Sequence, residues 1–163
     1  MVKENQLNLT IILMNVISIR EFEANDKNEV LHLFKLNTPP FFAVEEEEDL
    51  IQYLEKEREL FYVLLSDQTI VGCGGINFTD RHTTGKLSWD IIHPLYQGKS
   101  LGSKLLTFRL NKLRSLDGLT KIMVRTSQLA FKFYEKHGFE CVEIKQDYWA
   151  KGLDMYTMEF NPK

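Results

Sequence analysis

The sequence predicts one mixed α/β domain, in which a sheet of about seven strands carries helices on both faces. The chain has 163 residues, of which 44% are hydrophobic and 26% charged. This is a globular composition, and the length suits one core. Strand-like and helix-like runs follow each other without repeats or linkers, so residues 1–163 form a single domain. Three of the strands follow one another directly, which departs from a regularly alternating parallel sheet and indicates a mixed one.

The first half is predicted to hold a strand, two helices and a run of three strands. Residues 15–22 alternate as a half-buried strand does. Asn25 or Asp26 can cap the first helix, which "TPP" ends. The acidic run 45–49 suits the start of a second helix better than a metal site, because negative charge is favoured at that end. The expected elements are helices at about 26–36 and 46–58 and strands at 60–66, 69–78 and 86–93, with a hairpin at Asp67-Gln68 and a stop at Pro94.

The second half is predicted to add two helices and three strands. Leu106, Leu110 and Leu113 recur at the spacing of one helical face, which indicates a helix over about 100–116. Gly138 ends a second helix that begins near residue 127. The expected strands are 121–126, 140–149 and 153–160.

Composition and cysteine usage exclude several function classes. The net charge of −3 argues against nucleic acid as a partner. Cys73 and Cys141 lie far apart and outside any C-x-x-C pair, which argues against a zinc site or disulfide framework and suits a reducing cytoplasm. The apolar run 9–14 is too short to span a membrane and lacks a signal-peptide cleavage site. Residues 1–13 are then an extra strand, a tail or a start-site artefact.

Two glycine-containing motifs resemble nucleotide-binding loops but fail on context. Residues 98–100 match the end of a triphosphate loop, yet its first glycine would have to stand at His93. The "GCGG" run at 72–75 continues into a strand, whereas a dinucleotide fingerprint must open a helix. We expect those glycines to allow a bulge or a close backbone approach.

What remains is a Gln97-x-x-Ser100-x-Gly102 turn between a strand and a helix. Free amides at a helix start, together with the helix dipole, attract a diphosphate without a metal. Gly98 and Gly102 keep side chains away from the backbone, Ser100 can cap the helix, and Lys99 adds positive charge. An ordinary glycine-containing helix start explains the same residues.

The turn is accompanied by a second motif. "WDIIHPLYQGKSLGSKLL" resembles the central motif of the GNAT acetyltransferase superfamily, a strand ending in x-P followed by [QR]-x-x-G-x-[GA] and a helix. Further on, Ala130, Tyr134, Gly138 and Phe139 resemble the second signature of that family, A-x-x-x-Y-x-x-x-G-F. The order of elements is also similar from about residue 15. The resemblance implies a GNAT-type fold with splayed central strands, and acetyl-CoA as co-substrate with no metal.

The resemblance also implies which residues bind the donor. Backbone groups of Ile91, Ile92 and His93 would pair with its pantetheine arm like an added strand, and an amide near Ile91 or Ile92 would stabilise the oxyanion. Ser127 stands where an asparagine often contacts this arm, so the contact is shorter or passes to Gln128. Amides of seven residues would hold the pyrophosphate: Gln97, Gly98, Lys99, Ser100, Leu101, Gly102 and Ser103. Ser100 stands where the family prefers glycine.

Tyr134 and Asp90 are the candidate catalytic residues. Tyr134 matches the usual acid of the family, which gives its proton to the coenzyme sulfur; alternatively it only packs under the cofactor. An alkyl amine with a pKa of about 10.4 must lose a proton before it attacks. Asp90 is the nearest carboxylate, and alternation places it on the face opposite Trp89 and Ile91. Asp90 is then the base, an anchor for a cationic substrate, or a salt-bridge partner. A water chain could replace it as the base. For His93, a role in the loop is favoured.

The expected function is direct, acetyl-CoA-dependent transfer of an acetyl group, or of a longer acyl group, to an amine of a small molecule or peptide. The alternative is a non-catalytic coenzyme-A-binding sensor or interaction module, and the retained Tyr134 favours the enzyme. Two groups of residues either pack in the core or line the acceptor site: the aromatic residues Tyr148, Trp149 and Tyr156, and the "PPFF" run at 39–42. The negative net charge leans towards a cationic amine. A homodimer through the closing strands or the N-terminal extension is plausible.

Overall fold

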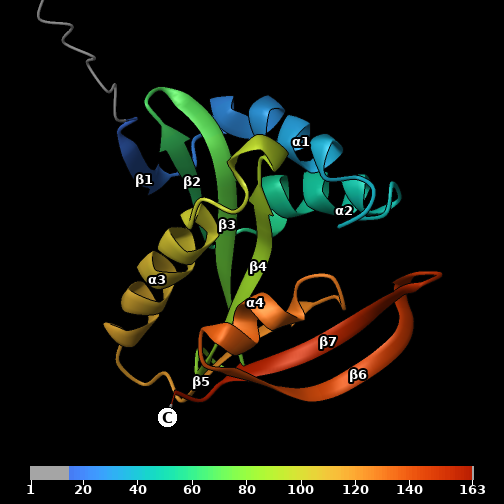
Figure 1. Cartoon of the computed structure of the whole chain (residues 1–163). Coiled ribbons are helices and arrows are strands. Elements are labelled where there is room, and N and C mark those ends of the chain that lie inside the picture. Colours follow the sequence, from blue (N-terminus) through green and yellow to red (C-terminus); the bar gives the residue numbers. More distant parts are fainter. Residues whose placement is uncertain (1–14, 163) are drawn as a thin grey trace, which may run out of the picture.

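Seven strands form one mixed sheet in the order β1-β2-β3-β4-β5-β7-β6 (Figure 1). The computed structural model describes residues 15–162, so the prediction for residues 1–13 lies outside the described residues. All neighbouring strands are antiparallel except β4 and β5, which are parallel. The strands are β1 (Ile17–Glu21), β2 (Leu60–Ser66), β3 (Thr69–Thr79), β4 (Thr84–Ile92), β5 (Lys121–Thr126), β6 (Phe139–Ala150) and β7 (Leu153–Phe160).

Helices cover both faces of the sheet, as predicted. The main helices are α1 (Lys27–Leu36), α2 (Glu46–Gln52), α3 (Leu101–Arg114) and α4 (Phe131–Lys136), with short helical turns at Ala24–Asp26, Tyr53–Glu57 and Pro94–Tyr96. Helices α1 and α2 lie on one face and α3 and α4 on the other (Figure 1). The helix expected from residue 127 begins only at Phe131, because the Ser127 carbonyl accepts the amides of Ala130 and Phe131 in a preceding turn. None of the helices between residues 15 and 162 has both the length and the apolar character needed to cross a bilayer.

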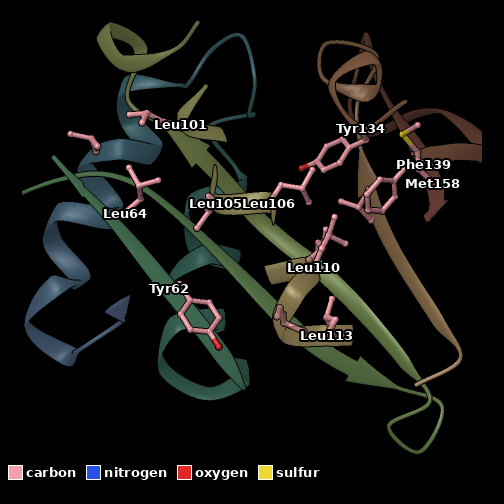
Figure 2. Close-up of a cluster of buried hydrophobic side chains, with 14 residues drawn as sticks. Tyr62, Leu64, Leu101, Leu105, Leu106, Leu110, Leu113, Tyr134, Phe139 and Met158 are labelled. Atoms are coloured by element: carbon pink, nitrogen blue, oxygen red, sulfur yellow. The ribbon is translucent and has the colours of Figure 1, made fainter. Parts of the chain in front are cut away.

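Each face of the sheet has its own hydrophobic core. The core under α3 and α4 contains Leu106, Leu110 and Leu113, which are at most 6% exposed and confirm the predicted helical face (Figure 2). Val124 of β5 and Leu87 of β4 point into this same core. The core under α1 and α2 is built on Val30, Leu33, Phe34, Leu50 and their neighbours on β2 and β3. The sheet therefore separates two hydrophobic cores.

Strands β4 and β5 pair over only part of their length. The pairs run from Thr84–Lys121 to Leu87–Val124. Beyond them, Ser88–Ile92 and Arg125–Thr126 have no partner on each other's strand among the described pairings, while β5 stays paired with β7 up to Thr126–Tyr156. We call this divergence the splay; it confirms the parted central strands implied by the family resemblance.

A β-bulge interrupts β4 beside the splay. Gly75 pairs with Ser88 and Cys73 with Ile91, so Trp89 and Asp90 both stand opposite Gly74. Trp89 adopts a left-handed φ of 53°, which is rare for a residue with a bulky side chain. A Cβ on Gly74 would lie 2.7 Å from Nη1 of Arg109, closer than such contacts allow. The prediction that the "GCGG" run permits a bulge and close backbone approach is confirmed.

Candidate active site

The turn before α3 is built on two left-handed residues. Gly98 has φ 73° and Ser100 has φ 62°. The family preference for glycine at position 100 thus has a physical basis, because a β-carbon is unfavourable in this conformation. The Ser100 carbonyl accepts the amide of Lys104 at 3.1 Å, but its side chain makes no cap hydrogen bond. The predicted side-chain cap is wrong, since that bond requires an extended backbone at the capping residue.

Several amides of this turn are free to bind an anion. Within residues 15–162, the amides of Gly98, Lys99 and Ser100 have no hydrogen-bond partner, whereas Gln97 donates to Pro94 at 3.4 Å. The first residues of α3, 101–103, have no acceptor within their own helix. The Lys99 ammonium lies nearby, 5.2 Å from the Tyr96 ring centroid. The free amides of this turn suit an anion, and the amide of Gln97 is already engaged.

The side chain of Gln97 has a structural role that the sequence did not reveal. Its Nε2 donates to the Ile92 carbonyl and to Oδ1 of Asn37, both at 3.0 Å. The buried Asn37 also donates to the Ile92 carbonyl, at 3.2 Å. Together they tie the end of β4 to the end of α1. Nothing in the sequence around Asn37 signalled this contact.

Of the three backbone positions predicted to meet the pantetheine arm, only Ile92 faces the splay. The His93 amide donates to the Val71 carbonyl of β3 at 2.8 Å, and its ring Nδ1 accepts the Leu95 amide at 3.1 Å, which confirms its loop role. In an antiparallel pair, successive residues point their amides alternately towards the partner strand and away from it. Because the His93 amide bonds to β3, the amide of Ile92 points away from β3 and that of Ile91 points towards it. The prediction is therefore corrected for Ile91 and His93.

Ser127 and Gln128 both serve local structure. Ser127 is buried, and its hydroxyl oxygen accepts the Leu129 amide at 3.3 Å in the turn before α4. Gln128 donates to the Gly152 carbonyl at 2.6 Å and accepts the Asp154 amide at 2.8 Å. Gln128 thus holds the β6–β7 turn through both polar atoms of its side chain, and its contact with the cofactor arm stays a prediction.

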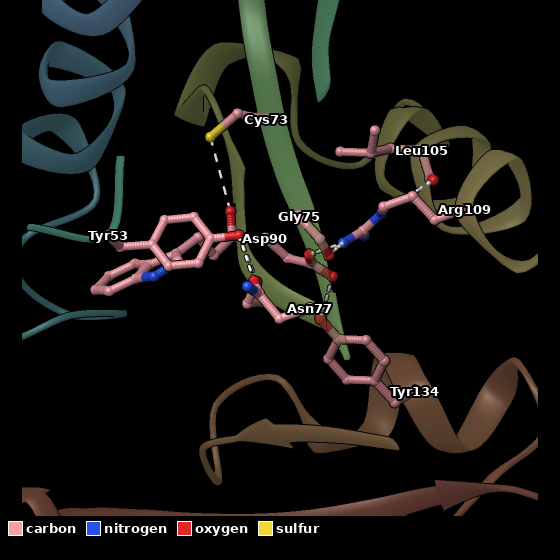
Figure 3. Close-up of polar contacts among 10 residues, drawn as sticks. Tyr53, Cys73, Gly75, Asn77, Asp90, Leu105, Arg109 and Tyr134 are labelled. Atoms are coloured by element: carbon pink, nitrogen blue, oxygen red, sulfur yellow. Dashed lines mark hydrogen bonds and ion pairs between the residues drawn. The ribbon is translucent and has the colours of Figure 1, made fainter. Parts of the chain in front are cut away.

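Asp90 and Tyr134 meet in a buried cluster with Arg109 (Figure 3). Oδ1 of Asp90 lies 2.5 Å from Nη1 of Arg109, and Oδ2 accepts the Tyr134 hydroxyl. Nη1 of Arg109 also donates to the Gly75 carbonyl at 3.1 Å, and the arginine side chain is only 1% exposed. Of the roles predicted for Asp90, the structure shows the salt-bridge partner.

The charges in this cluster keep the phenol protonated. Burial raises the pKa of Tyr134 well above its usual value, and the negative charge of Asp90 raises it further against the opposing effect of Arg109. Burial alone would lower the pKa of Arg109, but Asp90 outweighs it, so the guanidinium stays charged. Arg109 was not among the predicted site residues, although it lies three residues after Leu106 and four before Leu113 on the same helical face.

The opposite face of β4 carries aromatic and neutral polar groups. Trp89 stacks on Phe42 with ring centroids 6.0 Å apart. The Tyr53 hydroxyl donates to Oδ1 of Asn77 at 2.7 Å and accepts from the Ser88 hydroxyl at 3.2 Å. Asp90 therefore lies on the face opposite Trp89, as the alternation predicted.

The aromatic residues of the closing strands divide between the two faces. Nε1 of Trp149 donates to the Thr126 carbonyl at 3.1 Å, so this indole lies at the splayed end of β5. Tyr148 lies beside it, with ring centroids 4.9 Å apart. Tyr156 instead stacks on Phe131 at 4.7 Å and packs against the core under α4. Tyr156 is thus a core residue.

Comparison with known proteins agrees with this fold. Residues 27–139 match the acetyltransferase (GNAT) family. This stretch is more than half of the chain, and the chain belongs to that family. The resemblance predicted from the two motifs is confirmed.

Individual relatives are distant. An amino-acid acetyltransferase of Edwardsiella ictaluri is 24% identical over 82% of this chain, but the chain spans only 29% of that enzyme's length. The ribosomal-protein-S18-alanine N-acetyltransferase of Escherichia coli has a TM-score of 0.74 at 18% identity, covering 89% of this chain and 93% of its own. An aminoglycoside 6'-N-acetyltransferase complexed with coenzyme A has a TM-score of 0.71 at 17% identity, covering 87% and 95%. These solved structures establish the shared fold.

Proposed function

We propose that this protein is an acetyl-CoA-dependent N-acetyltransferase, which transfers the acetyl group directly to an amine of a small molecule or peptide. One observation carries the proposal. The free amides before α3 and the amide of Ile92, which points away from β3, lie along the splayed part of β4. Each of these amides offers a hydrogen-bond donor, which is what an anionic, acyl-bearing co-substrate needs along its length, and the Tyr134 hydroxyl lies beside the same strand, bonded to Asp90.

Residues of the turn and of β4 would hold the co-substrate. Amides of Gly98 to Ser103 suit its pyrophosphate, and the amide of Ile92 suits the arm that lies in the splay. One of the similar structures is complexed with coenzyme A, which supports coenzyme A as the group to be bound. When bound, acetyl-CoA supplies the acetyl group as a thioester. Everything else in the site comes from the chain.

Tyr134 is the proton donor in this proposal, and Asp90 and Arg109 are its positioning residues. The phenol keeps its proton over the physiological pH range because burial and Asp90 raise its pKa. Asp90 fixes the direction of the hydroxyl, and Arg109 balances the carboxylate charge. Both Asp90 oxygens are engaged and lie on the α3/α4 face, so we do not assign it the role of base for the amine.

The acceptor, the location and the assembly are proposed from the relatives, the cysteines and the edge strand. Similar proteins are named for amino acids, a ribosomal-protein alanine and aminoglycosides, all of which offer amines. We propose a reducing, cytoplasmic location because Cys73 is buried and Cys141 exposed, and both are free thiols. The homodimer stays a prediction; Val142 and Ile144 on the edge strand β6 are more than half exposed, which is compatible with it.

The proposal is tested by following free thiol release from acetyl-CoA with a panel of amines. We expect Tyr134→Phe to lower kcat about 10- to 1000-fold while acetyl-CoA binding, measured by calorimetry, is retained. Tyr62→Phe is the matched control, since Tyr62 is equally buried in the same core but has no hydrogen bond within the described residues. Tight binding of acetyl-CoA without turnover of any amine would instead favour the non-catalytic sensor.

A further inference from the structure

Two cationic side chains lie beside the splay, on the face covered by α1 and α2. Leu87 and Val124 point into the opposite core, so alternation turns Lys86 and Arg125 to this face. Lys86 stands opposite Met123, and Arg125 is the first β5 residue beyond the last pair with β4. The two cations therefore flank the place where the strands begin to part.

Arg125 is held in place by neutral groups only. Its Nη1 donates to the Tyr148 hydroxyl at 3.2 Å and lies 4.0 Å from the Met155 sulfur. The guanidinium carbon is 5.8 Å and 6.0 Å from the ring centroids of Tyr148 and Trp149. Its Nε is buried and has no hydrogen-bond partner in the described part of the chain. The side chain is thus oriented without being neutralised.

Neither cation has an anionic partner in the part of the chain that the structure describes. The five ion pairs formed among residues 15–162 all use other residues. Burial lowers the pKa of Lys86, and the positive charge of Arg125 lowers it further. The carboxylates of β7, the strand next to β5, are otherwise engaged: Glu159 pairs with Lys121 at 2.9 Å, and Asp154 accepts the Asp147 amide at 2.9 Å. Two half-buried cations thus lie beside the splay with their charges unpaired by any carboxylate of residues 15–162.

We propose that the acceptor amine carries a carboxylate, which binds between Lys86 and Arg125 beside the splay. This inference rests on the proposed function and deepens it. A guanidinium presents paired donors that match a carboxylate, and a half-buried cation gains most from such a partner. Trp89, Tyr148 and Trp149 would then cover the apolar part of a small amino acid.

The proposal reverses the expectation of a cationic acceptor. That expectation came from the net charge of −3, which averages over the whole surface. Recognition depends instead on the charge next to the reacting amine, and Lys86 and Arg125 make that charge positive. A polyamine or aminoglycoside would meet repulsion at this position.

The experiment compares matched acceptors on matched variants, after acetyl-CoA binding has been verified by calorimetry. Each acceptor set is an amino acid, its carboxamide, and its aminophosphonate counterpart. We expect Arg125→Gln and Lys86→Gln to lower kcat/KM for the amino acid about 10- to 100-fold and to leave the carboxamide unchanged. Arg125→Lys should recover part of the loss. Lys136→Gln, an equal charge change on the exposed end of α4, is the control and should have no effect.

Several results would overturn the inference. If wild type prefers the carboxamide or a polyamine, the acceptor is not a carboxylate, although the proposed function stands. If it prefers the aminophosphonate, the anion is of another kind. If acetyl-CoA does not bind, both proposals fail. If no amine is turned over, calorimetry compares the binding of N-acetyl amino acids with that of their amides in the presence of coenzyme A. Tighter binding of the acid, abolished in Arg125→Gln, would support the site. Equal binding of acid and amide would refute it.

Discussion

Removal of the Arg109 charge should destabilise the protein strongly. In Arg109→Met, a side chain of similar length stays in the core, but Asp90 loses its only ion-pair partner among residues 15–162. Breaking a buried pair by removing one member typically costs about 3–5 kcal/mol, because the remaining charge is left uncompensated. The carbonyl of Gly75 also loses its donor, which adds to the cost. We therefore expect the free energy of unfolding to fall by about 3–5 kcal/mol.

The assay is urea unfolding at pH 7, followed by circular dichroism, with a thermal scan alongside. For a domain of this size, the loss corresponds to a fall in Tm of roughly 6–20 °C. Arg114→Met is the control: Arg114 is exposed in the last turn of the same helix and lies 5.0 Å from the Phe160 ring centroid, so we expect at most about 1 kcal/mol. The double variant Asp90→Asn with Arg109→Met should be far less destabilised than the two single losses added together.

The reasoning would be refuted if Arg109→Met behaves like Arg114→Met, or if the double variant is simply additive. Either result would mean that solvent screens Asp90, whose side chain is 21% exposed, well enough that its pairing contributes little.

Two further predictions concern the turn and the buried phenols. Ser100→Gly should raise the free energy of unfolding by about 0.5–1 kcal/mol in urea, because glycine accepts the left-handed φ of 62° without strain; a loss of stability would show that the conformation is not strained. Burial raises the pKa of Tyr53 to about 12, so in the unfolded chain this phenol ionises near pH 10 while the folded protein still holds the proton. Between pH 10 and 12, the free energy of unfolding should therefore fall by about 2–3 kcal/mol more in wild type than in Tyr53→Phe. Urea unfolding at these pH values measures it, and an equal fall with pH in the two proteins would contradict the assignment.

The order of elements could be predicted from the sequence because local patterns determine it. Strand β5 was predicted at its observed bounds, since a short β-branched run between a glycine-containing loop and a turn has few alternatives. The start of α4 was placed too early, because the turn at Ser127 uses the same residue types as a helix start. Two motifs at the right positions then made the family recognisable.

The site was less predictable because its contacts join residues far apart in the chain. Asn37 and Gln97 meet only after folding, and so do Asp90, Arg109 and Tyr134. Alternation correctly separated Asp90 from Trp89, but it could not tell which face of the sheet each would occupy. The bulge decides that, and a bulge leaves little trace in the sequence beyond a nearby glycine.

The extra residue in β4 has a consequence for how this strand can evolve. Ser88 and Trp89, adjacent in the chain, both point towards α1 and α2, and only this irregularity returns Asp90 to the side of Arg109. If the same residues paired with β3 regularly, without the bulge, the residues before Trp89 and those after it would exchange sides relative to each other. The carboxylate would then enter the compartment of the acceptor and abandon its guanidinium. A change that straightens the bulge while keeping every residue should consequently be harder to tolerate than the loss of a single contact, whereas removal of Trp89 alone would leave Ser88 and Asp90 on the opposite sides that they already occupy.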